Sequence, residues 1–312
     1  MFYIKKASAT GRYEINLFGI KMKFLTKCPP PDNLGNLLYE LADPRTLKNI
    51  RLPKILDIEN SIDKLISSDK SVARYGDGEF KLIMGENIGF QKYDSKLSQR
   101  LKEILRNDND NVFVGLVDIF GYCPNKYMKK VITICRETLY EYIDFDKTYL
   151  DACLARKFKF SSEEYGHDYY NKLKSLWQNK DIVIVEGAGS RLGVGNDLFD
   201  GAKSIERIIC PIKNAFSKYD KILSECLKQP KNKLFILALG PTATVLAVDL
   251  ANKGYRALDI GHLDTCYETF LRKADKFVPV EGKIVFNSER YNCLLKPCKD
   301  ENYNKQIITE IK

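Results

Sequence analysis

The chain contains no apolar run of about 18 residues, the length that a membrane-spanning helix requires. Its first residues lack the apolar region and the small-residue cleavage site of a signal peptide. These absences argue against a membrane-spanning or exported protein, so we expect a cytoplasmic one. Internal repeats and extended low-complexity tracts are also missing.

Cysteine is present nine times, but no two cysteines form a CxxC pair. Cys293 and Cys298 are the only close pair, and their spacing alone does not make a zinc site. An odd number of cysteines without a pattern, in a chain without an export signal, indicates reduced thiols rather than a disulfide framework.

The composition, with 44% hydrophobic and 29% charged residues, is ordinary for a globular protein. The net charge of +9 is uneven, because residues 1–56 carry much of the excess of lysine and arginine. The stretch 16–27 mixes apolar and basic residues. It suits either an anionic membrane surface or, as we prefer, packing of an amphipathic arm on its own domain. The rest of the chain is near charge balance and shows no basic-aromatic stripe, which argues against nucleic acid.

From Ser71 onward, short β-branched runs alternate with helical periodicity, which predicts an α/β fold with a mostly parallel sheet and helices on both faces. We predict strands at 71–75, 112–117, 181–186, 205–210, 233–239 and 255–259, with a strand-like piece at 283–286. We predict helices near 57–67 and at 94–106, 125–142, 166–178, 215–228, 242–253 and 262–273. This gives a single domain at 57–275, a basic N-terminal arm at 1–56, and a C-terminal extension at 276–312 packed on the domain.

The first candidate motif follows the strand at 71–75. Asp77 and Glu79 are separated by one glycine, and such a pair of oxygen ligands suits a hard divalent cation. Gly76 and Gly78 let the backbone turn and a ligand approach, while Arg74 offers a positive fork for phosphate. A carboxylate pair, a metal and an arginine together suggest a nucleotide diphosphate. A solvated turn with a helix N-terminal glutamate is the alternative interpretation.

The second motif follows the strand at 181–186 and is rich in glycine, so it can present backbone N–H groups to a phosphate or a sugar. Glu186 is a candidate for sugar hydroxyls or a metal, and Arg191 adds charge. The motif matches neither a P-loop nor the usual dinucleotide pattern. The candidate residues are Glu186, Gly187, Ser190, Arg191, Gly193, Asn196 and Asp197. A glycine-rich connection without a ligand is the alternative.

The third motif, Gly240-Pro241-Thr242, stands where the strand at 233–239 gives way to a helix. Proline at the first helical position and nearby hydroxyls form a helix N-terminus that favours anions. Binding and simple capping are equally compatible with it.

The fourth motif contains Asp259, Gly261, His262 and Asp264 after the strand at 255–259. His262 is one of only two histidines, and it is a candidate general base, metal ligand or diphosphate contact. Its alternative role is capping of a helix, held by a neighbouring aspartate. Weaker candidates, each more consistent with a structural role when taken singly, are Gln91, Tyr93, Asp118, Arg156 and Asn214.

Taken in order, these four motifs resemble the bacterial GT-D-type glycosyltransferases, once catalogued as a domain of unknown function, DUF1792. The similarity covers roughly residues 60–275. The resemblance implies a Rossmann-like nucleotide-sugar transferase that uses a divalent cation, manganese before magnesium, through an Asp-x-Glu motif at Asp77 and Glu79. Known members glucosylate a growing glycan from UDP-glucose.

The expected function is therefore transfer of a hexose, with glucose favoured, from a UDP-sugar to a glycan, glycoprotein or lipid-linked saccharide of the bacterial surface. The catalytic candidates are Asp77, Glu79, His262 and Asp264. The donor-binding candidates are Arg74, Gly76, Gly78, Gly240, Pro241, Thr242, Asp259, Gly261 and the residues of the second motif. Two other functions fit the same residues: a metal-dependent phosphoesterase or pyrophosphatase, and a non-catalytic module that binds nucleotide or glycan. The basic arm allows peripheral contact with the inner face of the membrane.

Overall fold

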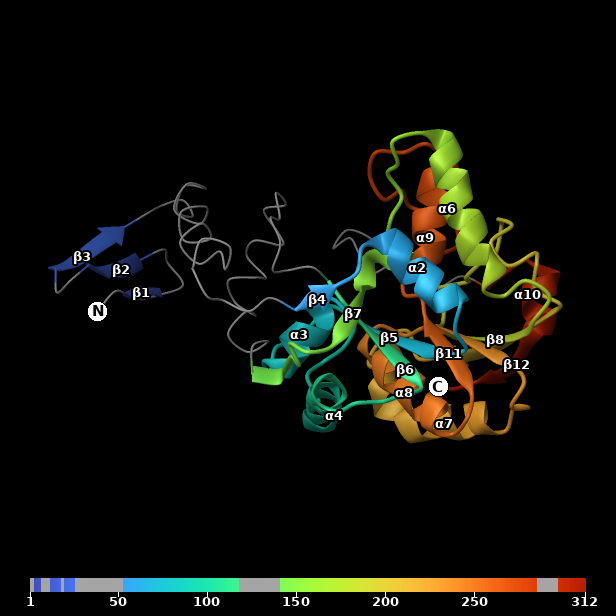
Figure 1. Ribbon diagram of the computed structural model, residues 1–312, viewed down its shortest axis with the longest axis horizontal. Helices are drawn as coiled ribbons and strands as arrows, with labels where there is room; N and C mark the ends of the chain where they lie inside the picture. The colour runs from blue at the N-terminus through green and yellow to red at the C-terminus, as the bar shows by residue number, and fades with distance from the viewer. Residues whose placement is uncertain (1–2, 7–11, 18–19, 26–52, 118–140, 285–296) are drawn as a thin grey trace. The chain divides into compact units, whose positions relative to one another are not determined.

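The structure, a computed structural model, describes residues 3–6, 12–17, 20–25, 53–117, 141–284 and 297–312 (Figure 1). The chain divides into two compact units. The smaller unit contains the first three strands, and the larger unit contains every other described element. Among the described residues, none of the helices combines the length and the apolar character needed to cross a bilayer.

The smaller unit holds an antiparallel sheet of β1 (Tyr3–Lys6), β2 (Arg12–Leu17) and β3 (Ile20–Leu25), in the order β1-β2-β3. Leu17 pairs with Ile20, so only two residues connect β2 to β3. Much of the basic and apolar stretch at 16–27 thus lies in paired strands. The membrane contact predicted for it stays a prediction.

The larger unit is built on a nine-stranded sheet in the order β12-β9-β8-β10-β11-β5-β6-β7-β4, and every neighbouring pair is parallel. Six of its strands occupy the predicted positions to within one residue at each end, which confirms the predicted fold class. The strands are β4 (Lys54–Ile55), β5 (Ser71–Tyr75), β6 (Val112–Leu116), β7 (Thr148–Asp151), β8 (Asp181–Gly187), β9 (Ser204–Cys210), β10 (Leu234–Ala238), β11 (Arg256–Asp259) and β12 (Ile307–Glu310).

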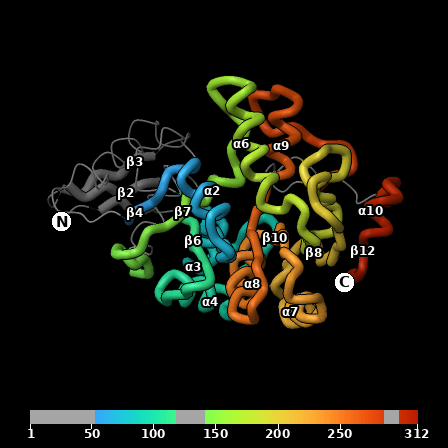
Figure 2. The backbone as a smooth tube through the Cα atoms, turned by 45° about the vertical axis from the view of Figure 1, so that its right-hand side comes forward, coloured from blue at the N-terminus to red at the C-terminus, as the bar shows by residue number. Residues whose placement is uncertain are grey.

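Helices cover both faces of this sheet. The helices α3, α4, α7 and α8 lie on one face, whereas α2, α6 and α9 lie on the other (Figures 1 and 2). Their bounds are α2 (Ile58–Ile66), α3 (Asp77–Ile83), α4 (Ser95–Arg106), α6 (Glu163–Ser175), α7 (Tyr219–Leu227), α8 (Pro241–Asn252), α9 (Leu263–Leu271) and α10 (Glu301–Gln306), with 3-10 turns η2 (Ala152–Ala155) and η3 (Ala215–Lys218).

The core on the α2, α6 and α9 face is made by apolar side chains of these helices against the sheet. Ile62 of α2, Tyr170 of α6 and Phe270 of α9 belong to one buried cluster with Ile184 and Ile236 of the central strands. The central strands are buried along most of their length, because helices cover both of their faces.

Three short strands, β4, β7 and β12, were not predicted from the sequence, and β12 brings the C-terminal segment into the sheet beside β9. The predicted helix at 125–142 lies almost entirely outside the described residues. The predicted strand at 283–286 is described only at Lys283 and Ile284, which belong to no strand. The helix predicted at 215–228 begins as a 3-10 turn and becomes α-helical at Tyr219.

Candidate active site

The four motifs converge on one edge of the sheet. They follow β8, β10, β11 and β5, which are neighbours in the strand order. In a parallel sheet all of these strands end at the same edge, and ligands bind where the strands give way to loops. The predicted site residues are therefore brought together from segments nearly 200 residues apart.

Arg74 and Asp259 form a buried clamp between β5 and β11. Nη2 of Arg74 lies 3.1 Å from Oδ1 of Asp259, and its Nε donates to the Asp259 backbone oxygen at 2.6 Å. Nη1 of Arg74 also donates to the backbone oxygen of Ala152 at 2.8 Å. Burial raises the pKa of Asp259, and the Arg74 guanidinium opposes that rise. Both side chains therefore hold strands and loops together, and the predicted contact of Arg74 and Asp259 with the donor stays a prediction.

Gly261 serves the same clamp. Its backbone has φ of +50°, and a Cβ atom at this position would overlap Nη2 of Arg74. Glycine is needed here because the guanidinium occupies the space that a side chain would take.

Asp77 and Glu79 lie in the first turn of α3, not on a loop edge. Glu79 Oε2 accepts a hydrogen bond from the backbone N–H of Gly76 at 2.7 Å, which caps the helix. Asp77 is partly exposed and lies 3.2 Å from Nζ of Lys81. Burial raises the pKa of Glu79 to about 7, while the bond from Gly76 opposes the rise. The helix-capping glutamate of the alternative interpretation is thus present, but it is buried rather than solvated.

Two carboxylates at positions i and i+2 of a helix do not face each other. Within the described residues, no group of three or more His, Cys, Asp and Glu side chains is arranged to hold a metal ion. Asp77 and Glu79 are nevertheless hard oxygen donors, and burial holds the pKa of Glu79 above its usual value. This donor set fits a cation that completes its coordination with phosphate oxygens and water, as magnesium-type sites do.

The start of α8 lies beside the start of α3. A Cβ atom on Gly78 would lie 3.9 Å from Cγ of Pro241, the first residue of α8. Gly240, with φ of +55°, is in close contact with the ring of Phe90. Oγ1 of Thr242 is buried and has no hydrogen-bond partner. Two positive helix ends therefore meet at the edge, and the nucleotide contact predicted for the start of α8 stays a prediction.

His262 is the N-cap residue of α9, but its side chain makes no capping hydrogen bond. The capping role suggested as its alternative is therefore not what the structure shows. Burial first, and then the positive charges of Arg156 and Arg74, lower the pKa of His262 to about 3, with Asp77 acting in the opposite direction. The imidazole is neutral near pH 7 and lies among these charged groups.

The loop after β8 is held by a buried ion pair. Oε1 of Glu186 lies 2.6 Å from Nη1 of Arg207, and both side chains are almost fully buried, at 0% and 3% exposed. Oε2 of Glu186 accepts from the backbone N–H of Leu192 at 2.8 Å. Glu186 thus shapes the loop, and its predicted contact with a sugar or a metal stays a prediction.

Other predicted binders of this loop also have protein partners. Arg191 is buried and donates to the backbone oxygen of Gly282 at 2.6 Å. Asp197 lies 2.7 Å from Nζ of Lys174. The structure places Gly187 at the end of β8 and leaves Ser190 partly exposed.

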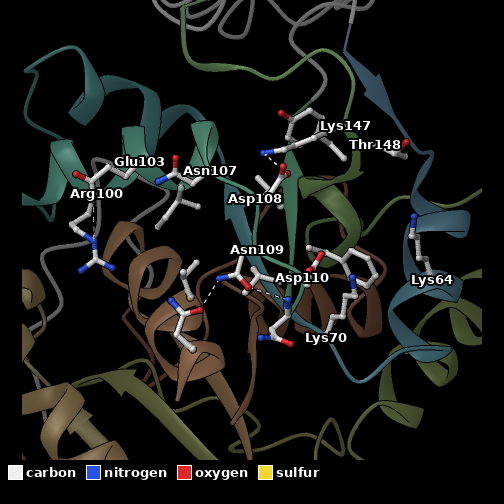
Figure 3. Close-up of a pocket in the computed structure, with 18 residues that line it drawn as sticks. Lys64, Lys70, Arg100, Glu103, Asn107, Asp108, Asn109, Asp110, Lys147 and Thr148 are labelled. Carbon is white, nitrogen blue, oxygen red and sulfur yellow. Dashed lines mark hydrogen bonds and ion pairs between the residues drawn. The ribbon is translucent and has the colours of Figure 1, made fainter. Parts of the chain in front are cut away.

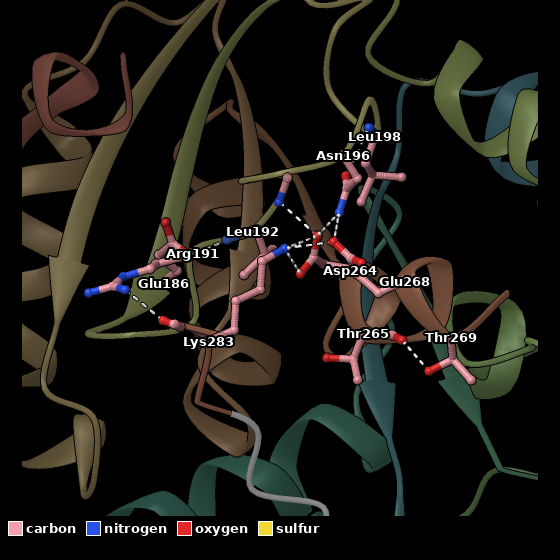
Figure 4. A network of polar contacts seen from close by, with 12 residues as sticks. Glu186, Arg191, Leu192, Asn196, Leu198, Asp264, Thr265, Glu268, Thr269 and Lys283 are labelled. Atoms are coloured by element: carbon pink, nitrogen blue, oxygen red, sulfur yellow. Dashed lines mark hydrogen bonds and ion pairs between the residues drawn. The ribbon is translucent and has the colours of Figure 1, made fainter. Parts of the chain in front are cut away.

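Asp264 is engaged in a buried network that the sequence did not reveal (Figure 4). Its carboxylate lies 2.8 Å from Nζ of Lys283 and accepts from Gly193 and Asn196, each at 2.8 Å. Asn196 and Lys283 also contact Glu268, at 2.8 and 3.4 Å. Asp264 is therefore a structural anchor of this network, and its predicted catalytic role stays a prediction. Nothing local to Lys283 marked it in advance, since its partners come from distant segments.

The weaker candidates are distributed around the same edge. Asn214 donates its backbone N–H to the backbone oxygen of Phe90 at 2.8 Å. The neighbouring Gln91 is buried. Tyr93 is 45% exposed, and Arg156 is exposed at the end of η2. Asp118 lies outside the described residues.

A separate hollow of about 690 Å³ lies at the opposite edge of the sheet (Figure 3). Val112 and Thr148, the first residues of β6 and β7, line it together with Lys64, Lys70 and Lys147. Its lining contains none of the predicted donor-binding residues, so the hollow is distinct from the site at the carboxyl edge.

Comparison with known proteins identifies the family. The sequence pattern of the glycosyltransferases of GT-D fold matches residues 72–288. The chain belongs to this family.

The chain is similar to a probable glycosyl transferase Gly of Streptococcus gordonii and to glycosyltransferase GlyD of Streptococcus pneumoniae serotype 4. The first is 37% identical over 286 residues, covering 87% of this chain and 40% of the relative. The second is 34% identical over 290 residues, covering 90% of this chain and 35% of the relative. The chain thus spans less than half the length of these two proteins.

Solved structures show the same fold. A structure described as a new glycosyltransferase (DUF1792) from Streptococcus sanguinis is 37% identical, with a TM-score of 0.77 over 84% of this chain and 100% of that one. Another, described as DUF1792 with a distinct glycosyltransferase fold, is 35% identical, with a TM-score of 0.78 over 90% of this chain and 100% of that one. The GT-D fold predicted from the four motifs is confirmed.

The buried ion pair between Glu186 and Arg207 predicts a loss of stability when it is broken. Arg207→Met should lower the free energy of unfolding by about 3–5 kcal/mol, because Glu186 is left as an uncompensated buried charge. The double variant with Glu186→Gln should recover part of that loss. Urea denaturation followed by circular dichroism measures both, and equal losses in the single and double variants would contradict the assignment.

The lowered pKa of His262 predicts a pH dependence of stability. Between pH ~6.5 and pH ~3 the unfolded chain binds a proton that the folded protein does not, so stability falls as the pH falls through this window. His262→Gln removes this linkage. From pH 7 to pH 5 the wild type should lose on the order of 1 kcal/mol more unfolding free energy than the variant. Equal losses in denaturant titrations at the two pH values would show that His262 is not held neutral.

Proposed function

We propose that the chain is a UDP-sugar-dependent hexosyltransferase that moves glucose, in preference to other hexoses, onto a glycan acceptor of bacterial surface polysaccharide or glycoprotein. One observation carries the proposal within the glycosyltransferase family. The positive ends of α3 and α8 meet at the carboxyl edge beside Asp77, Glu79 and His262. Helix N-termini and hard oxygen donors together suit a nucleotide diphosphate and its counter-ion.

A divalent cation, manganese before magnesium, would be held by Asp77 and Glu79. When bound, it would neutralise the negative charge that develops on the leaving diphosphate. Glu79 remains in the capping hydrogen bond with Gly76, so its second oxygen is the one proposed for the cation. Asp77 is the more accessible of the two carboxylates.

Arg156 replaces Arg74 in our assignment of the arginine that faces the donor. The guanidinium of Arg74 is committed to Asp259 and Ala152. Arg156 is exposed at the end of η2, and among the described residues no carboxylate forms an ion pair with it. Arg156 follows β7 through η2 and so stands at the carboxyl edge of the sheet, and its charge contributes to the lowered pKa of His262. A planar guanidinium there suits the donor phosphates.

His262 is proposed to orient the acceptor hydroxyl or the donor through a hydrogen bond from its neutral imidazole. A pKa of about 3 makes it a weak base in the free protein. The negative diphosphate of a bound donor would raise that pKa, because an opposite charge favours imidazolium. In the transfer itself, the bond between the sugar and the diphosphate breaks, the acceptor oxygen bonds to the sugar, and the acceptor proton is released.

Calorimetric titration with UDP, with and without Mn²⁺, tests the nucleotide site. Binding that depends on Mn²⁺ supports the transferase, and absence of UDP binding would overturn it. Release of UDP from UDP-glucose that requires an added glycan acceptor separates a transferase from a phosphoesterase or pyrophosphatase, which needs no acceptor. Cytoplasmic location at the membrane face, through the basic N-terminal arm, belongs to the same proposal.

Asp77→Asn and Glu79→Gln should each weaken the Mn²⁺-dependent part of UDP binding on the order of 10-fold. Glu79→Gln is informative because glutamine can also cap the helix, so the change removes charge and spares the cap. Glu301→Gln makes the same substitution in the exposed first turn of α10 and serves as the control. An unchanged metal dependence in both site variants would exclude this pair as the metal ligands.

Substitutions of Arg156 and Arg74 should have different effects on UDP binding and on stability. Arg156→Gln should weaken UDP binding on the order of 10-fold at unchanged stability, because the side chain is exposed. Arg74→Gln should instead lower the free energy of unfolding by about 3 kcal/mol, because it leaves Asp259 buried without its partner. Calorimetry and urea denaturation of both variants measure these effects. If Arg156→Gln binds UDP as tightly as the wild type, Arg156 is not the arginine that contacts the donor.

A further inference from the structure

The segment Val280–Ile284, here called the strap, contacts the glycine-rich loop Gly187–Leu198 at two points and the first turns of α9 at a third (Figure 4). The backbone oxygen of Gly282 accepts from Nη1 of Arg191 at 2.6 Å. The backbone N–H of Ile284 donates to the backbone oxygen of Gly189 at 2.8 Å. Lys283, between them, reaches the carboxylates of α9.

The third contact is a buried charge cluster. The side chains of Lys283, Asp264 and Glu268 are only 3%, 5% and 6% exposed. One ammonium therefore faces two carboxylates, which stand one helical turn apart on α9 and repel each other. Arg272, at 3.2 Å from Glu268, supplies a second positive charge from the surface. Removing the ammonium would leave two like charges buried against each other, an arrangement that costs far more than an exposed pair.

The same carboxylates hold the loop. Asp264 Oδ1 accepts both the backbone N–H of Gly193 and the side chain of Asn196, and Glu268 accepts from Asn196 as well. The loop backbone has positive φ at Arg191, where a side chain makes this conformation costly. The loop is thus held by contacts from outside it, and Lys283 contacts both carboxylates that make them.

We propose that the strap fixes the loop after β8 in its ligand-binding shape, and that Lys283 is the positioning residue through which it acts. The consequence for binding rests on the proposed function, because the loop ends at the edge where the UDP-sugar is placed. The mechanical part, that Lys283 holds the loop, does not rest on it.

Three variants test the proposal in the full chain. Lys283→Met removes the ammonium, and Lys283→Arg keeps the charge. Lys233→Met removes a lysine of another ion pair, 2.6 Å from Glu206 at the opposite edge of the sheet, and controls for a general loss of stability. Hydrogen exchange of the amides from Gly187 to Leu198 is the first measurement, and the affinity for UDP in the presence of Mn²⁺ is the second.

In Lys283→Met, exchange of the loop amides should rise and the affinity for UDP should fall, each on the order of 10-fold. Lys283→Arg should restore most of the loop protection and most of the UDP affinity. Lys233→Met should leave loop exchange and UDP affinity near wild type. Unchanged loop exchange in folded Lys283→Met, or an equal rise in Lys233→Met, would overturn the proposal. Faster loop exchange in a protein whose wild type binds no UDP would support the strap and reject the proposed function.

The wild type provides a measurement that does not depend on the folding of a variant. The amides of Ile284 and Gly193 bond to different partners but belong to the same assembly. If the strap and the loop open together, their protection factors should agree within about threefold across a series of low urea concentrations. Opening of Ile284 well before Gly193 would show that the strap does not hold the loop.

Discussion

Parallel pairing of the nine strands is the constraint on which the rest of the structure depends. A parallel strand cannot return through a tight turn, so each connection crosses one face of the sheet, commonly as a helix. All strands then end at one edge, and the helices that follow them begin there. The adjacent strands β8, β10, β11 and β5 place four loops next to one another, which is how segments far apart in the sequence contribute to a single site.

Burial decides which of the polar residues at this edge are available for chemistry. Arg74 with Asp259, Glu186 with Arg207, and Asp264 with Lys283 are ion pairs with side chains between 0% and 13% exposed. Buried charges of this kind require their partners, since an unpaired charge away from water is costly. These pairs therefore hold the loops in place. Asp77, with its partner Lys81, and the side chains of Arg156 and His262 lie beside them.

The same reasoning explains how far the sequence could be interpreted. The central strands were predictable because the run 182–185 is apolar on both faces, and all six strands were predictable because short β-branched runs alternate with helical periodicity. The marginal strands β4 and β12 could not be predicted, because runs of two to four residues carry no periodic signal. The site's location was predictable from strand ends. The ion pairs were not, since Lys283 and Asp264 become neighbours only in three dimensions.

The positive charge of the helix N-termini at the carboxyl edge is too small to neutralise the diphosphate of the proposed donor. Each helix N-terminus contributes about half an elementary positive charge, so α3 and α8 together supply about one. Each phosphate of a sugar nucleotide is linked through oxygen on two sides and keeps about one negative charge, because the second ionisation of a phosphate monoester is not available to it. Arg74 is neutralised by Asp259, and Asp77 at the start of α3 is paired with Lys81. Burial raises the pKa of Glu79 to about 7, so this carboxyl is only partly ionised near neutral pH. The two helix ends would therefore offset only part of the charge of the proposed donor. In our proposal a cation held by Asp77 and Glu79, together with the guanidinium of Arg156, would offset the rest.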